Sequence, residues 1–203
     1  VSVIDMDPTK TDAVSFGGDY EEWQYTTSHM QYIAFNAERG PFNSEAMRKA
    51  FSFAVDRESI CNVDMLRNAV PASQPDIWSD GEGFSINRFT SELHAAGIED
   101  SDNDGVLDYG EADDCLPLEI DFIVSRDNEY KLSAANRIAG DMRNAGIKIN
   151  LRTLSWEEYL ETLEAGDFDM YLGEVKLTAD FDISELISSD GELNFGKYKD
   201  EQT

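Results

Sequence analysis

Apolar residues recur either at every second position, as in strands, or at three- and four-residue steps, as in helices, and these two patterns divide the chain into short strands and helices. In the first half, Tyr32 to Phe35 form a short apolar strand, and Gly40-Pro41 then forces a turn. Asn43 or Ser44 offers a cap for a helix whose apolar stripe recurs at three- and four-residue steps, at Met47, Ala50, Phe51, Ala54 and Val55. We expect a second helix from Asp56 through Ile60 to about Leu66, a loop over 68–88, and a helix from about Asn87 to Gly97.

The second half alternates between the two periods. A period of two predicts strands over 116–124, 147–151 and 168–172. Helical spacing separates them: one helix carries Leu132 to Met142 and closes at Gly146, and another begins with the Ser155–Glu158 capping box and ends at Gly166. This β-α-β-α-β order predicts an α/β fold with a mixed, largely parallel sheet flanked by helices. Ligands of such sheets usually meet the loops at the carboxyl ends of the strands.

Charge narrows the range of partners. The chain has 203 residues, of which 42 are acidic and 16 basic, for a net charge of −26. Such a surface repels phosphate backbones and anionic headgroups, so we expect neither nucleic acid binding nor membrane adsorption. No stretch approaches the roughly 20 apolar residues of a spanning helix, and no signal sequence opens the chain. Cys61 and Cys115 are either joined in a disulfide or two separate thiols.

An acidic loop fits the calcium-loop pattern. Asp100, Asp102 and Asp104 occupy positions 1, 3 and 5 of the roughly 12-residue motif, and Gly105 allows the turn at position 6. The other expected ligands are the Val106 carbonyl, Asp108 and a bidentate Glu111. We expect a structural Ca²⁺ here, with a plain acidic turn as the alternative. A regulatory calcium switch is disfavoured because a strand, not a helix, follows the loop.

Four ordered segments carry a family likeness. The first covers 32–57 and contains a strand followed by Phe-Asn at 32–36, then Pro41-Phe42, then the Arg-x-Ala and Ala-x-Asp-Arg motifs at 48–57. The other three are 95–98, 145–149 and 166–171. This arrangement resembles the extracellular solute-binding proteins of family 5, the oligopeptide-, dipeptide- or nickel-binding components of ABC importers. The resemblance implies a periplasmic-binding-protein type II-like lobe over 31–203, after a weakly patterned segment at 1–30. It also implies that the chain is a truncated second lobe.

The resemblance also implies a function and a site. A two-lobed monomer would close around an oligopeptide or a related small solute and deliver it to ABC permease subunits, in the periplasm or lipid-anchored at the outer face of the membrane. In the family, an aspartate of a Trp-x-Ala-Asp-Tyr motif pairs with the amino terminus of the ligand. The matching stretch, 177–181, places Asp180 there, but Leu177 and Phe181 replace the tryptophan and the tyrosine. Alternatively, Asp180 is a solvated loop acid or caps a helix through Leu186.

Enzymatic motifs are missing from the sequence. His29 and His94 stand apart from any nucleophile motif, and there is no phosphate loop and no Gly-x-Ser-x-Gly elbow. We therefore expect a binding protein, with glycoside hydrolysis as a residual alternative. The main competing hypothesis is a calcium-binding extracellular interaction module without a small-molecule ligand. Trp23, Trp78 and Trp156 could line a cleft, but we expect packing roles, above all for Trp156.

Overall fold

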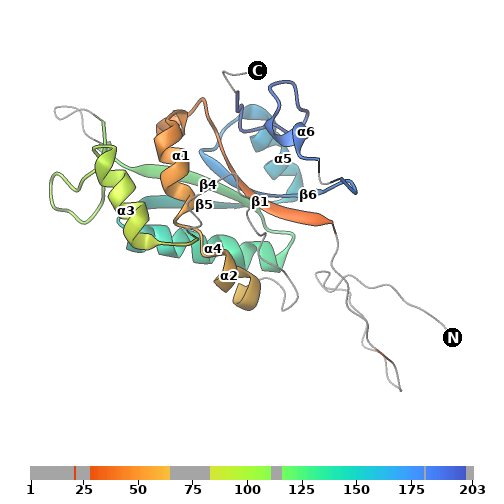
Figure 1. Cartoon of the computed structure of the whole chain (residues 1–203), viewed down its shortest axis with the longest axis horizontal. Coiled ribbons are helices and arrows are strands. Elements are labelled where there is room, and N and C mark those ends of the chain that lie inside the picture. The colour runs from red at the N-terminus through yellow and green to blue at the C-terminus, as the bar shows by residue number, and fades with distance from the viewer. Residues whose placement is uncertain (1–20, 22–27, 65–82, 111–115, 181, 200–203) are drawn as a thin grey trace.

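One mixed sheet organises the part of the chain that the structure describes. The computed structural model describes residue 21 and residues 28–64, 83–110, 116–180 and 182–199 (Figure 1). Its strands are β1 (His29–Phe35), β4 (Glu119–Ser125), β5 (Lys148–Leu154) and β6 (Met170–Lys176), in the order β1-β6-β4-β5. β4 is parallel to both β5 and β6, whereas β1 runs antiparallel to β6 at the edge. The predicted mixed, largely parallel sheet is confirmed.

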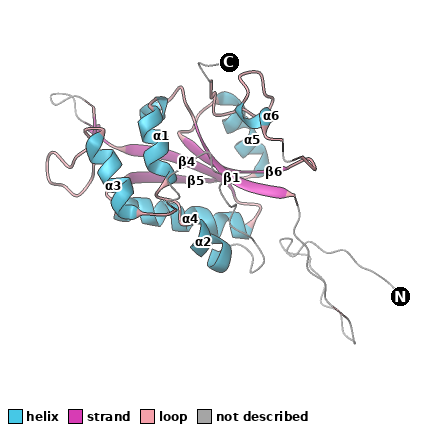
Figure 2. Ribbon diagram, viewed as in Figure 1, coloured by secondary structure: helices cyan, strands magenta, loops and turns pink. Residues whose placement is uncertain are grey.

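Helices cover both faces of this sheet (Figure 2). The larger core lies between one face and three helices, α1 (Glu45–Ser52), α3 (Ile86–Ala95) and α4 (Glu129–Asn144). The smaller core lies on the other face, where Ile123 and Tyr171 pack against α5 (Trp156–Ala165). Because β4 is buried on both faces, Phe122, Ile123 and Val124 are all inaccessible to solvent.

The remaining elements are short. They are η1 (Gly40–Asn43), α2 (Arg57–Ser59), the π-helical turn η2 (Ile60–Asp64), β2 (Asp108–Tyr109), β3 (Leu116–Pro117) and α6 (Ser184–Ile187). Among the described helices, none has the length and apolar character required to cross a bilayer.

The predicted helix boundaries are largely confirmed by their caps. Ser155 and Glu158 form the expected capping box, and Gly166 ends α5 in the left-handed conformation, with φ of 68°. Asp56 accepts a hydrogen bond from the Ser59 backbone N–H, as expected for the start of the second helix. This helix is α-helical over Arg57–Ser59 and continues as a π-helical turn over Ile60–Asp64, whereas its predicted end at about Leu66 lies outside the described residues.

Several boundaries were misplaced. The first long helix ends at Ser52, so Ala54 lies in the turn that follows it, although it is fully buried, and Val55 lies beyond that turn. The strand predicted over 116–124 is two strands, β3 and β4, interrupted at Leu118. The proposed division into segments 1–30 and 31–203 stays a prediction, because most of the first segment lies outside the described residues.

Candidate functional site

The carboxyl ends of the three parallel strands meet at one edge of the sheet. β4 ends at Ser125, β5 at Leu154 and β6 at Lys176, and the residues that follow them form the loops of this edge. The register pairs Ile123 of β4 with Tyr171 of β6, so the last residues of β6 lie beyond Ser125, the end of β4. β6 and its partner β1 therefore continue past the end of β4. This is the edge at which ligands of parallel sheets are usually bound.

Hydrogen bonds connect the first two loops. The Arg126 backbone N–H donates to the Leu154 carbonyl at 2.8 Å. The Trp156 backbone N–H donates to Asp127 Oδ2 at 3.1 Å, so a carboxylate after β4 satisfies a free amide at the start of α5. The loops after β4 and β5 therefore form one continuous surface, from which the N-termini of α4 and α5 lead away.

Trp156 lies on this surface and is largely in contact with solvent. Its side chain is 53% exposed, although the ring stacks on Tyr159 with centroids 5.7 Å apart. The expectation that Trp156 is a packing residue was therefore only half right. Tyr159 anchors one side of the indole, and the other side is available to a ligand or to another protein surface.

Asp180 lies in the loop after β6. Its side chain is exposed, and it accepts a hydrogen bond from the Thr178 hydroxyl. This hydrogen bond lowers the pKa of Asp180 below its ordinary value, so the carboxylate is ionised at neutral pH. The alternative role as a helix cap is wrong, because Asp182 accepts the hydrogen bond from the Ser184 N–H at the start of α6.

The acidic loop brings three predicted metal ligands together. Carboxylate oxygens of Asp100, Asp102 and Asp108 lie within 4.8 Å of one another. Asp108 is only 7% exposed, and its Oδ2 accepts a hydrogen bond from the Ser101 N–H at 2.8 Å. Gly105 has φ of 91°, as the predicted turn requires.

Of the other predicted calcium ligands, the structure describes Asp104 and Val106 but not Glu111. The Asp104 side chain accepts a hydrogen bond from the Val106 N–H at 2.8 Å, within the same loop. Glu111 lies outside the described residues, as do Cys115, Trp23 and Trp78. Burial raises the pKa of the Cys61 thiol, and the disulfide with Cys115 stays untested.

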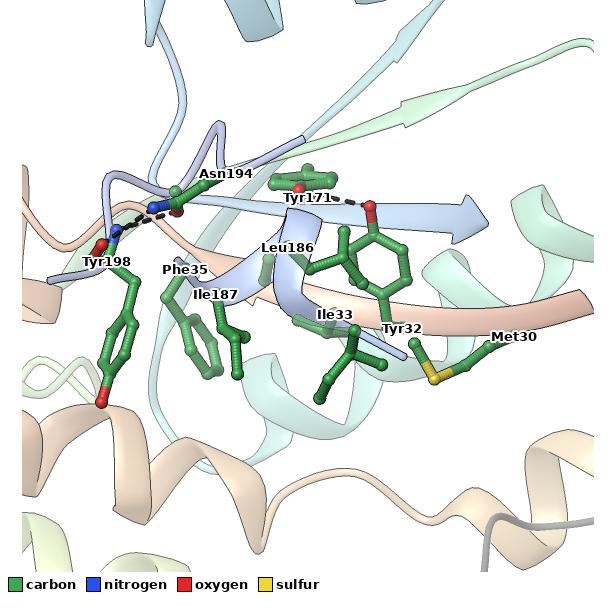
Figure 3. A pocket seen from close by; sticks show the side chains of 12 residues that line it. Met30, Tyr32, Ile33, Phe35, Tyr171, Leu186, Ile187, Asn194 and Tyr198 are labelled. Carbon is green, nitrogen blue, oxygen red and sulfur yellow. Dashed lines mark hydrogen bonds between the residues drawn. The ribbon is translucent and has the colours of Figure 1, made fainter. Parts of the chain in front are cut away.

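A groove that the sequence did not indicate runs beside β1 (Figure 3). It encloses about 240 Å³ between β1 and the segment that contains α6. The Tyr32 and Tyr171 hydroxyls lie 3.4 Å apart at its inner side, and burial raises the pKa of both tyrosines. The lining residues are Met30, Tyr32, Ile33, Ala34, Phe35, Tyr171, Ile183, Leu186, Ile187, Asn194, Gly196 and Tyr198.

The outer wall of the groove is held by a buried amide. Asn194 donates from Nδ2 to the carbonyls of Ser188 and Tyr198, at 2.9 and 2.8 Å, and accepts from the Tyr198 N–H at 3.0 Å. Sequence periodicity could not reveal this groove, because α6 has only four residues and no apolar repeat.

Comparisons with known proteins identify a family and several relatives of this chain. The family described as bacterial extracellular solute-binding proteins, family 5 Middle, matches residues 3–184. A probable deoxycholate-binding periplasmic protein of Escherichia coli is 26% identical over 176 residues, which cover 85% of this chain and 32% of that protein. The periplasmic oligopeptide-binding protein of Salmonella typhimurium is 25% identical over 146 residues, which cover 68% of this chain and 25% of that protein.

A solved structure confirms the fold. The oligopeptide-binding protein AppA from Bacillus subtilis, in complex with a nonapeptide, superposes with a TM-score of 0.72 at 21% identity, over 87% of this chain and 37% of that chain. The type II periplasmic-binding-protein lobe expected from the sequence is thereby confirmed. The 203 residues span only a quarter to about a third of the curated relatives, so most of a relative's length lies outside the matched region.

Proposed function

Because the chain belongs to the bacterial extracellular solute-binding proteins of family 5, we propose that it forms most of one lobe of a two-lobed receptor that captures oligopeptides or a related small solute for an ABC importer. Members of this family bind solutes and are not enzymes, which agrees with the expectation from the sequence. Family membership also favours a receptor over an interaction module that has no small-molecule ligand.

The observation that carries the proposal is the position of Asp180. An exposed carboxylate with a lowered pKa lies in the loop that follows β6, at the edge where the parallel strands end. In a closed cleft, such a carboxylate makes a strong charge-assisted hydrogen bond to the ammonium group of a peptide. Trp156, exposed at the same edge, offers an apolar surface to the rest of the ligand.

Calorimetry on the full-length receptor tests this assignment. We expect trialanine to bind and N-acetyl-trialanine to bind at least about 10-fold more weakly, because acetylation removes the positive charge. Asp180→Asn should weaken trialanine binding by a similar factor. The matched control is Asp182→Asn, since Asp182 is an equally exposed neighbour that hydrogen-bonds Ser184. Equal affinities of parent and Asp180→Asn for trialanine would disprove the anchor.

We propose that the receptor acts either at the outer face of the cell membrane, held there by a lipid anchor, or in the periplasm. In both locations its partners would be ABC permease subunits. The supporting observation is that the matched family is extracellular by description. Cell fractionation of the native host separates the two locations, and globomycin treatment, which blocks lipoprotein processing, tests the anchor.

We also propose that the loop from Asp100 to Glu111 binds a structural Ca²⁺. The convergence of Asp100, Asp102 and Asp108 supports this second role, because carboxylates this close repel one another and a bound cation would offset their charge, beyond what the backbone N–H groups of the loop provide. The Val106 carbonyl, Asp104 and Glu111 complete the expected set of oxygen ligands.

Calcium titration into the chelator-treated chain tests the loop. We expect a dissociation constant of roughly 10⁻⁴ to 10⁻³ M, as in extracellular modules, and a higher melting temperature with calcium. Glu111→Gln and Asp108→Asn should each abolish the heat of binding, whereas Asp190→Asn, an exposed acid outside the loop, should not. A flat titration of the parent chain would remove the metal from the proposal.

A further inference from the structure

Backbone hydrogen bonds connect the acidic loop to the amino edge of the sheet, where β4 and β5 begin. The Leu107 N–H donates to the Gly146 carbonyl at 2.7 Å, and the Leu107 carbonyl accepts from the Leu118 N–H at 2.6 Å. The Leu118 carbonyl in turn accepts from the Lys148 N–H at 3.0 Å. Since Gly146 and Lys148 are only two residues apart in the chain, these three bonds close a ring, which we call the amino-edge ring.

The amino-edge ring is closely packed against the turn between α4 and β5. A Cβ atom at Gly146 would lie 3.2 Å from the Leu107 side chain and 3.4 Å from the Gly105 carbonyl oxygen. Leu118 is only 1% exposed, and Leu107 packs against the larger core. Movement of residues 105–107 would therefore separate the acidic loop from the turn that leads into β5.

Asp108 joins the ring to the predicted metal ligands. It directly follows Leu107, and its carboxylate lies within 4.8 Å of those of Asp100 and Asp102 although the residue is only 7% exposed. Its Oδ2 accepts a hydrogen bond from the Ser101 N–H, but it forms no salt bridge with any residue that the structure describes. A carboxylate buried to this extent ordinarily has a positively charged partner or a metal ion. This buried charge therefore points to a cation from outside the chain.

The remaining donors around the cluster are backbone amides. The Asp104 N–H donates to Asp100 and Asp102, both at 3.1 Å, and the Gly105 N–H donates to Asp100 at 3.0 Å. Such amides supply only partial positive charge, so repulsion among the carboxylates is reduced but not removed. Asp108 can relieve the repulsion by moving away from Asp100 and Asp102, and that movement pulls the adjoining Leu107 away from Gly146.

We infer that calcium in the acidic loop determines how readily the amino-edge ring opens. Repulsion opens the ring when the ion is absent, and the bound ion closes it by offsetting the charge of Asp108. The inference rests on the calcium site proposed above and identifies what the ion regulates, the local stability of the edge where β4 and β5 begin. The carboxyl edge, with Trp156 and Asp180, lies at the other end of the strands and outside the ring, so it should not respond to calcium.

Amide hydrogen exchange in the full-length receptor tests this coupling. If each opening of the ring releases calcium, the ion slows exchange of the Leu118 and Lys148 amides in proportion to its own binding. At about 5 mM CaCl₂, a dissociation constant of roughly 10⁻⁴ to 10⁻³ M predicts exchange roughly 6- to 50-fold slower than in chelator. The chelator sample contains NaCl at matched ionic strength, which controls for screening. The Arg126 amide, which bonds to Leu154 at the carboxyl edge, is the internal reference and should not change.

The outcomes separate this inference from the calcium site itself. Calcium binding by calorimetry with unchanged exchange of Leu118 and Lys148 overturns the inference and leaves the site intact. Equal slowing at Arg126 also overturns it, because the effect would then extend over the whole fold. If calorimetry detects no calcium binding, the site and the inference fail together.

A charge substitution gives an independent readout. Asp108→Asn removes the negative charge but keeps a side-chain oxygen that can accept from the Ser101 N–H. In chelator, the Leu118 and Lys148 amides of this variant should exchange at least about 3-fold more slowly than those of the parent, and calcium should no longer affect them. Asp190→Asn, an exposed acid outside the loop, should behave like the parent. Exchange in Asp108→Asn as fast as in the calcium-free parent contradicts the inference, because repulsion would not be what opens the ring.

Discussion

Arg39 brings three carboxylates together at the edge opposite the candidate site. Its guanidinium lies 3.3 Å from Asp121, 2.8 Å from Asp167 and 3.3 Å from Asp169. Burial raises the pKa of Asp169, whereas the hydrogen bond from Arg39 lowers the pKa of the more exposed Asp167. Two neighbouring carboxylates with the same cation therefore contribute to stability with opposite dependence on pH.

We predict opposite pH effects for the two corresponding substitutions. Folding raises the pKa of Asp169, so ionisation of this carboxyl group destabilises the folded parent as pH rises above about 4. Asp169→Asn cannot ionise, and its stability relative to the parent should therefore increase with pH in that window. With its pKa lowered, Asp167 stabilises the fold above about pH 4 and loses this contribution as pH falls. Asp167→Asn should therefore approach the parent in acid. Urea unfolding at several pH values checks both signs, and parallel pH profiles would refute them.

Among the elements, α4 begins with a side-chain cap. Asn128 Oδ1 accepts hydrogen bonds from the N–H groups of Tyr130 and Lys131, both at 3.0 Å. We predict that Asn128→Ala lowers the free energy of unfolding by about 1 kcal/mol, because two amides lose their acceptor. Asn136→Ala, on the exposed side of the same helix, should be neutral or slightly stabilising. Urea denaturation distinguishes them, and equal losses would argue against the cap.

Sequence patterns identified the elements where local chemistry decides the structure. Ser155, Glu158 and Gly166 determine the ends of α5 through bonds within one turn, so its limits followed from the sequence. The partner of β1 did not, because pairing His29–Phe35 with Met170–Lys176 depends on contacts about 140 residues apart. The same holds for the groove, whose wall depends on Asn194 bonding to Ser188 and Tyr198.

At the scale of the whole molecule, charge repulsion opposes folding. A net charge of −26 on 203 residues is concentrated when the chain becomes compact, and salt screens it over a Debye length of about 10 Å at 0.1 M and about 3 Å at 1 M. We predict that raising NaCl from 0.1 to 2 M increases the melting temperature by about 5 °C or more.

A charge-reduced variant separates screening from other effects of salt. Glu161 and Glu164 are exposed acids in the last turns of α5, where negative charge also opposes the helix dipole. Replacing both with glutamine should raise the melting temperature at 0.1 M NaCl and reduce its increase with salt. If parent and variant respond identically, repulsion is not the cause.

The hydrogen bond between the Leu177 N–H and the Ser28 carbonyl has a topological consequence. The backbone enters the sheet at Ser28 and leaves it after Lys176 through neighbouring points, so the intervening 150 or so residues form a loop closed at its base. A chain segment whose two ends lie close together can be inserted into a surface turn of another protein without distorting the backbone of either protein. Both ends of the sheet-forming segment therefore lie at one point of the lobe.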